Sequence, residues 1–221
     1  MRDVPWWGVV SSAAAPVLLI GGWTVAAALQ PGTFDQVTGT ISALAADGAA
    51  DRWVMTLAFL GVGACYVVTG LALRPVALPG RILLMAGGVA VALVAANPLP
   101  GGGGGSARHT AAAAISFITL ATWPVPGARQ PPSAPWVVRR GRTLSAPWVL
   151  RRWGRVGSAA VLLALLVWFG VELNTAGGPV GLAERVLAAA EALWPLAVVL
   201  ACRLRRGRAG ARRGLDHEGE V

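Results

Sequence analysis

The chain has 221 residues, of which 55% are hydrophobic and only 13% are charged, against roughly 25% charged in ordinary soluble proteins. Its net charge of +9 comes from 19 arginines without a single lysine. Because so little polar surface cannot cover a globule of this size, the composition excludes a soluble enzyme, a disordered tail and a disulfide scaffold, and it leaves a polytopic membrane protein.

Six stretches of the chain are apolar enough to cross a bilayer, whose hydrocarbon core needs about 20 such residues per helix. None has the alternating pattern of a barrel strand, so we expect an all-α bundle. The fourth stretch is the shortest and is rich in alanine. The six predicted spans are residues 7–29, 53–73, 82–97, 110–124, 157–173 and 182–202.

These spans predict a transmembrane domain over residues 1–205, a basic loop over 126–156 and a disordered tail over 206–221. The first span also resembles a secretory signal, with Ala26-Ala27-Ala28 as a small-residue cleavage site, but its apolar run is long for that purpose. Tryptophans at span ends act as anchors at the membrane interface. Those at such positions are Trp6, Trp7, Trp53 and Trp123.

The arginines are divided very unevenly between the two sets of connecting segments that six spans define. Sixteen lie in the set that includes both termini, and only Arg52, Arg108 and Arg185 lie in the other. Basic segments stay on the cytoplasmic side of a membrane. We therefore expect a multi-pass protein of the plasma membrane with both termini in the cytoplasm.

The basic loop contains a short near-duplication. SAPWVVRR at 133–140 is followed by SAPWVLRR at 145–152, so each copy places a tryptophan before an arginine pair. Such a segment can contact anionic membrane lipids through Arg139, Arg140, Arg151 and Arg152, or it can serve topology alone. Since topology explains the basic excess, no nucleic-acid partner is expected. The sequence gives no indication of the oligomeric state.

The two cysteines, Cys65 and Cys202, lie within or at the ends of predicted spans. Neither falls on the oxidising side of the membrane, and they have no metal-ligand spacing. We expect them to be packing residues, and we expect neither a metal nor another cofactor.

Polar residues gather on the side of the membrane that is poor in arginine. Carboxylates, a histidine and arginines at such a surface can bind a phosphate headgroup, a divalent cation or an acyl-ester substrate. Ordinary interpretations stay open: Asp47 can cap the second helix, and Glu184 suits the start of the sixth. The residues are Asp35, Ser42, Asp47, Asp51, Arg52, Arg108, His109, Glu172, Asn174, Glu184 and Arg185.

Glu191 lies in the middle of the sixth predicted span. It follows Glu184 by seven residues, so the two share a helix face and are about 10 Å apart in depth. An exposed charge at that depth is costly. We therefore expect Glu191 to be protonated or paired inside the bundle, near Trp194 and Pro195.

Three segments are distinctive when taken together: TISALAADGAADRWVMTLAFLGVGACYVVTGLAL at 40–73, ANPLPGGGGGSARHTAAA at 96–113 and GLAERVLAAAEALWPLAVVLACRL at 181–204. They resemble a family of bacterial integral membrane proteins, domain of unknown function 998. The resemblance implies a six-helix membrane protein and singles out Ser42, Pro98, His109, Glu184, Arg185 and Trp194. Family members often carry an acid shortly after the proline, where this chain has Leu99-Pro100 and glycines.

Three functional hypotheses follow from these residues. The first is a membrane protein without an assigned reaction that binds a lipid or small ligand at a polar extracytoplasmic site. The residues expected at this site are Ser42, Asp47, His109, Glu184, Arg185 and Glu191. The second is a membrane hydrolase or lipid-remodelling enzyme, in which Ser42 attacks, His109 is the base and Asp47 or Glu184 orients it. The third is a small proton-coupled transporter that uses Glu191.

Overall fold

The computed structural model describes residues 4–102, 104–127 and 148–218, and of residues 205–218 the backbone only. Within these ranges the chain is helical and contains no strand. The long helices are α1 (Trp6–Ala28), α2 (Trp53–Ala72), α3 (Leu78–Ala96), α4 (Ala107–Thr122), α5 (Arg152–Glu172) and α6 (Val180–Glu218). The expected all-α fold is confirmed, and every predicted span corresponds to one of these helices.

Five of the six helices, all except α4, are long and apolar enough to cross a membrane. Helix α4 has 16 residues, which at 1.5 Å per residue gives about 24 Å, short of a core of about 30 Å. The chain thus has the helices of a multi-pass membrane protein.

Helices α3 and α5 begin four to five residues earlier than the predicted spans. Helix α3 begins at Leu78 with Pro79 in its first turn, a position that suits proline because no helical N–H is needed there. Helix α5 begins at Arg152, before the apolar run. Helix α6 continues to Glu218, so residues 206–218, expected to be disordered, are helical, in keeping with the helix propensity of their arginines and alanines.

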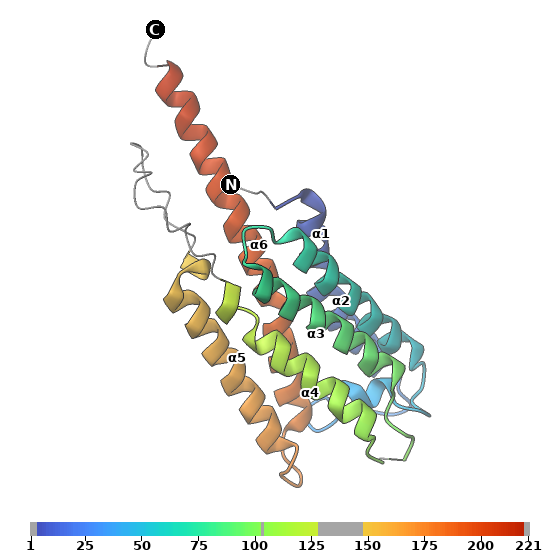
Figure 1. Cartoon of the computed structure of the whole chain (residues 1–221). Helices are drawn as coiled ribbons and strands as arrows, with labels where there is room; N and C mark the ends of the chain where they lie inside the picture. The colour runs from blue at the N-terminus through green and yellow to red at the C-terminus, as the bar shows by residue number, and fades with distance from the viewer. Residues whose placement is uncertain (1–3, 103, 128–147, 219–221) are drawn as a thin grey trace.

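The helices form an up-and-down bundle, in which successive helices run in opposite directions (Figure 1). Helix α1 packs on α2 and α6, α2 on α3, α3 on α4, and α4 on α6. These contacts close a ring of five helices, while α5 packs outside the ring against α4 and α6. Both ends of the described chain lie at the same end of the bundle, where α6 projects beyond its neighbours (Figure 1).

Small residues allow the closest approach between helices. A Cβ atom on Gly63 of α2 would lie 2.5 Å from the carbonyl oxygen of Gly88 on α3, and a Cβ on Gly88 would lie equally close to the carbonyl of Gly63. The hydroxyls of Ser11 and Thr69 are hydrogen-bonded at 2.9 Å between α1 and α2. Small-residue contacts and interhelical hydrogen bonds of this kind hold helices together in lipid.

The tryptophans at the helix ends differ in exposure. Trp6 and Trp53 are 69% and 59% exposed, as interfacial anchors should be, but Trp123 is only 1% exposed. The interfacial prediction is therefore wrong for Trp123, which lies in the main hydrophobic core. The reason is that the chain folds back after α4: the carbonyl of Gly127 accepts a hydrogen bond from the amide of Ala77 before α3.

Candidate functional site: a buried cavity below the α1–α2 loop

The α1–α2 loop, residues 29–52, contains a short 3-10 helix, η1 (Ser42–Ala45). It lies across the end of the bundle opposite the two chain ends (Figure 1). There its backbone is hydrogen-bonded to the first turn of α6 and to the α3–α4 loop. The amide of Leu182 donates to the carbonyl of Val37, and the amide of Asp47 donates to the carbonyl of Leu99. The loop is therefore fixed to the rest of the bundle at the start of α6 and at the α3–α4 loop.

Glu184 binds the α1–α2 loop from the first turns of α6. Its carboxylate accepts a hydrogen bond from the backbone amide of Ile41 at 2.5 Å and another from the hydroxyl of Ser42 at 3.1 Å. Glu184 is 3% exposed. Hydrogen bonds to a charged acceptor are the stronger kind, so this carboxyl holds η1 against α6.

Arg185 binds the same loop through a different group of atoms. Its Nη1 donates to the carbonyl oxygens of Gln36, Gly39 and Gly181 at 2.7–2.9 Å. The guanidinium also lies 5.9 Å from the centre of the Phe34 ring. Glu184 and Arg185 thus hold successive parts of one loop. Of the Arg185 guanidinium only Nη1 is used in this way, while its Nε and Nη2 are buried without a hydrogen-bond partner among the described residues.

Asp35 organises the outer turn of the loop. Its carboxylate accepts hydrogen bonds from the Thr38 hydroxyl at 2.6 Å and from the Val37 amide at 2.8 Å. The hydrogen bond from Thr38, with a further contribution from the Val37 amide, lowers the pKa of Asp35 below its ordinary value. This acid therefore shapes the turn.

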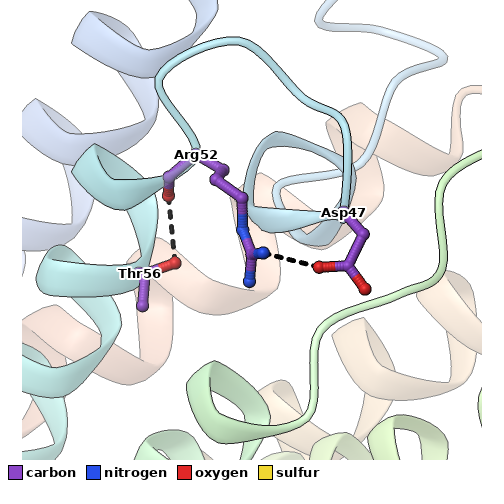
Figure 2. A network of polar contacts seen from close by, with 3 residues as sticks. All are labelled: Asp47, Arg52 and Thr56. Carbon is purple, nitrogen blue, oxygen red and sulfur yellow. Dashed lines mark hydrogen bonds and ion pairs between the residues drawn. The ribbon is translucent and has the colours of Figure 1, made fainter.

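Asp47 forms an ion pair with Arg52 at 2.5 Å, on the surface of the loop (Figure 2). Arg52 is the N-cap residue of α2, and it makes no side-chain capping hydrogen bond. The alternative in which Asp47 caps α2 is not found, because the Asp47 carboxylate pairs with the Arg52 side chain instead. Figure 2 also shows that the Arg52 carbonyl accepts a hydrogen bond from the Thr56 hydroxyl, at 3.0 Å, one turn into α2.

His109 lies in the first turn of α4 and is 6% exposed. Its Nδ1 is 2.9 Å from the carbonyl oxygen of Asn97, at the end of α3, and its backbone amide is capped by the Ser106 hydroxyl. The imidazole therefore connects α4 to the end of α3.

A cavity of about 50 Å³ is lined by residues of all five helices of the ring and lies below the α1–α2 loop, toward the interior of the bundle. The loop contributes Ile41 and Ser42 to its wall, and α6 contributes Glu184, Ala188 and Glu191. These three α6 residues follow a spacing of four and then three, so they share one helix face. The other lining residues are Leu19, Phe59, Val62, Tyr66, Val91, Val94, Ala113, Ser116, Phe117 and Leu120.

Glu191 is the unusual member of this wall. It is 1% exposed, and among the described residues its Oε1 has no hydrogen-bond partner. The lining, as far as the structure describes it, includes no arginine or histidine. Leaving a buried acceptor unpaired costs about 1–3 kcal/mol, and more when it is charged, so a ligand in the cavity that donates to Glu191 would remove this cost.

The structure brings together only part of the residue set expected from the sequence. Ser42, Glu184 and Glu191 line the cavity, whereas Asp47, His109 and Arg185 do not appear in its wall. Ser42 donates to Glu184 and the ring of His109 pairs with Asn97, so no contact between nucleophile and base is formed in the described chain.

Sequence reasoning missed the aromatic part of the cavity. Phe59 and Tyr66 from α2 and Phe117 from α4 contribute rings to its wall. The spacing of seven residues between Phe59 and Tyr66 indicates a common helix face, but apolar spans carry aromatic residues on all faces. Their convergence with Glu191 depends on how the helices pack.

Comparison with protein families gives a match that covers most of the bundle. Residues 13–201 match the family model described as "Protein of unknown function (DUF998)". The chain belongs to the DUF998 family. The match takes in α1 from residue 13 onward, α2 to α5, and the part of α6 that carries Glu184, Arg185 and Glu191. It confirms the resemblance seen in the three sequence segments. Comparisons of this DUF998 protein with curated proteins and with solved structures gave no match.

Proposed function

We propose that this DUF998 protein is a six-span protein of the plasma membrane that binds a small ligand in the cavity below the α1–α2 loop. The observation that carries the proposal is the buried carboxyl of Glu191 in the cavity wall, whose Oε1 has no hydrogen-bond partner in the described part of the chain. Buried polar groups without partners are rare in folded proteins, and ionisable groups inside a membrane generally serve function.

The proposal includes α4 as the sixth span and places both chain ends in the cytoplasm. Two observations support this topology. The described chain begins and ends at one end of the bundle (Figure 1). In the sequence, sixteen of the nineteen arginines belong to the terminal segments and to the connections after the second and fourth predicted spans. Because basic segments stay in the cytoplasm, the α1–α2 loop and the cavity then face the extracytoplasmic side.

The topology is tested with single cysteines in a background where Cys65 and Cys202 are replaced. Arg108→Cys and Val125→Cys mark the two ends of α4. If α4 spans the membrane, an impermeant thiol reagent applied to intact cells labels the first and not the second. Labelling of both or of neither would show that α4 does not cross, and labelling of the second alone would reverse the orientation.

Ligand binding is tested by native mass spectrometry of the purified protein, with Ala113→Leu as a variant that fills the cavity from α4. A bound species carried by the unchanged protein and lost in Ala113→Leu supports the site. Gly157→Leu on α5, where a Cβ atom would meet nothing within 4 Å, is the control and retains the species. A protein that releases nothing in either form contradicts the proposal.

A transport function is the second candidate, because the same carboxyl lies in the interior of the bundle, where proton-carrying groups of transporters are found. Glu191→Gln keeps the shape of the side chain and removes its ionisation. Loss of proton-coupled flux in proteoliposomes containing this variant would favour transport. If the unchanged protein binds its ligand but shows no proton-coupled flux, the result favours a binding role.

The basic connection before α5 is proposed to rest on anionic lipid. Trp148 and Trp153, on either side of Arg151 and Arg152, are 63% and 85% exposed, as expected for rings that enter a membrane interface. Arg139 and Arg140, in the first copy of the repeat, lie outside the described residues. Replacing Arg152 with Gln should weaken retention of anionic lipid during purification, whereas the same change at Arg108 should not.

A further inference from the structure

We infer that the cavity below the α1–α2 loop binds a small primary ammonium ion of the size of methylammonium, with Glu191 as its counter-charge. The inference rests on the proposed ligand-binding function and names the chemical class of the ligand. Three features of the wall support it: its charge, its aromatic rings and its volume.

The charge of the wall calls for a cation. The acidic side chains in this wall are Glu184 and Glu191. Glu184 already accepts hydrogen bonds from Ile41 and Ser42, but Oε1 of Glu191 receives none in the described structure. An ammonium group donates hydrogen bonds and supplies the positive charge that a buried carboxylate requires.

Pro195 removes one donor from the helix beside this carboxyl. It has no backbone N–H, and in an α-helix that group would donate to the carbonyl of Glu191, four residues earlier. Ser116 on α4 also lines the cavity. Its hydroxyl donates to the carbonyl of Ala113 and retains its own acceptor capacity.

The rest of the wall is apolar and aromatic, and this favours an organic ammonium over a metal cation. Phe59, Tyr66 and Phe117 contribute rings, and aromatic faces attract ammonium ions, most strongly when water is excluded. A hard metal cation instead requires about six oxygen ligands. Among the described residues there is no cluster of three acidic, histidine or cysteine side chains to hold one.

The volume limits the size of the ligand. The cavity measures about 50 Å³, roughly a third of the 150 Å³ cavity that accommodates benzene in an engineered core. By that proportion it holds two or three non-hydrogen atoms. Methylammonium meets this limit, whereas tetramethylammonium exceeds it and offers no N–H donor to Glu191.

The inference is tested on the full-length purified protein in detergent, at constant ionic strength, by thermal unfolding and calorimetric titration. Methylammonium chloride should raise the unfolding temperature in a saturable manner, while tetramethylammonium and sodium chlorides should not. In Glu191→Gln, the affinity for methylammonium should fall at least about ten-fold, because the acceptor keeps its oxygen but loses the counter-charge of the ammonium ion. Glu172→Gln, a carboxyl on α5 that pairs with Trp168 outside the cavity, should bind as the unchanged protein does.

Two further arms separate the failure of this inference from failure of the proposed function. Ala113→Leu should abolish methylammonium binding by filling the space, even if Glu191→Gln does not fold. If methanol, a neutral molecule of the same size, stabilises the protein in a manner blocked by Ala113→Leu while methylammonium does not, the cavity binds ligands and the cation inference is overturned. If no probe binds and no species is released on mass spectrometry, both proposals fail.

Discussion

The carboxylate of Glu184 accepts the backbone amide of Ile41 at 2.5 Å, which joins the start of α6 to the α1–α2 loop across 143 positions of sequence. Ile41 and Ser42 also line the cavity whose wall includes Glu191. The contact therefore fixes two lining residues of the loop against α6, and Glu184 itself is a third lining residue.

Replacing Glu184 with Gln should release the α1–α2 loop. The amide of glutamine cannot present two acceptor oxygens, so one of the donors at Ile41 and Ser42 loses its partner, at a cost of about 1–3 kcal/mol. Limited proteolysis within residues 29–52 should become faster and the unfolding temperature should fall. Ser42→Ala, which removes only the hydroxyl, should have the smaller effect; an equal or larger effect would contradict the dominant role of the Ile41 amide.

Arg185→Lys should weaken the same loop although the positive charge is kept. One nitrogen of Arg185 reaches three carbonyl oxygens, those of Gln36, Gly39 and Gly181, and a lysine ammonium does not reproduce the reach and shape of the guanidinium. We expect destabilisation of about 1–3 kcal/mol in reversible unfolding, as for the loss of hydrogen bonds to a charged group. Arg108→Lys, at an exposed position of α4, is the matched control and should change stability little.

Much of this architecture could be predicted from the sequence. Hydropathy located all six helices, because apolar runs of span length have few alternatives. It misplaced the starts of α3 and α5, since helix initiation at Pro79 and Arg152 depends on backbone geometry rather than apolarity. Trp123 was misplaced because its burial depends on the backbone contact between Gly127 and Ala77.

The candidate site was predictable only in part. The spacing of Glu184 and Glu191 placed both on one helix face, and the structure shows both in one cavity wall. Glu184 accepts a hydrogen bond from the backbone amide of Ile41. Because backbone amides are not specific to one residue type, the sequence could not identify this partner. Asp47 pairs with Arg52, and His109 pairs with the carbonyl of Asn97. Residues predicted to lie on the same side of the membrane therefore need not contact one another.

Gly88→Val should separate α2 from α3. Any Cβ at Gly88 would lie 2.5 Å from the carbonyl oxygen of Gly63, so the backbones must move apart and lose close packing. Overpacking of this kind costs about 1–3 kcal/mol, measured as a lower unfolding temperature in detergent. Gly21→Val on α1, where a Cβ would meet nothing within 4 Å, is the control; comparable losses at both positions would show that helix propensity, not contact, sets the effect.

Thr69→Val should loosen the contact between α1 and α2. The change keeps the branched shape but removes the hydroxyl that pairs with Ser11 at 2.9 Å, and interhelical hydrogen bonds in membranes are worth about 0.6 kcal/mol on average and up to about 1.7. Thr24→Val is the control, because the exposed hydroxyl of Thr24 bonds only within α1, to the carbonyl of Ile20. The two free energies of unfolding should differ by the interhelical contribution, and a double variant with Ser11→Ala should cost little more than Thr69→Val alone.

His109→Ala should reduce stability and leave ligand binding intact. The imidazole joins α4 to the Asn97 carbonyl and does not line the cavity, so its loss should lower the unfolding temperature without changing the affinity for a cavity ligand. The enzyme hypothesis predicts the opposite, since a catalytic base can be removed with folding preserved. Unfolding and binding are measured on the same preparation to separate the two hypotheses. A stable His109→Ala protein that has lost turnover of an ester or phospholipid substrate would favour the hydrolase hypothesis. Ser42 would then have to leave Glu184 and contact His109 in a conformation other than the one described.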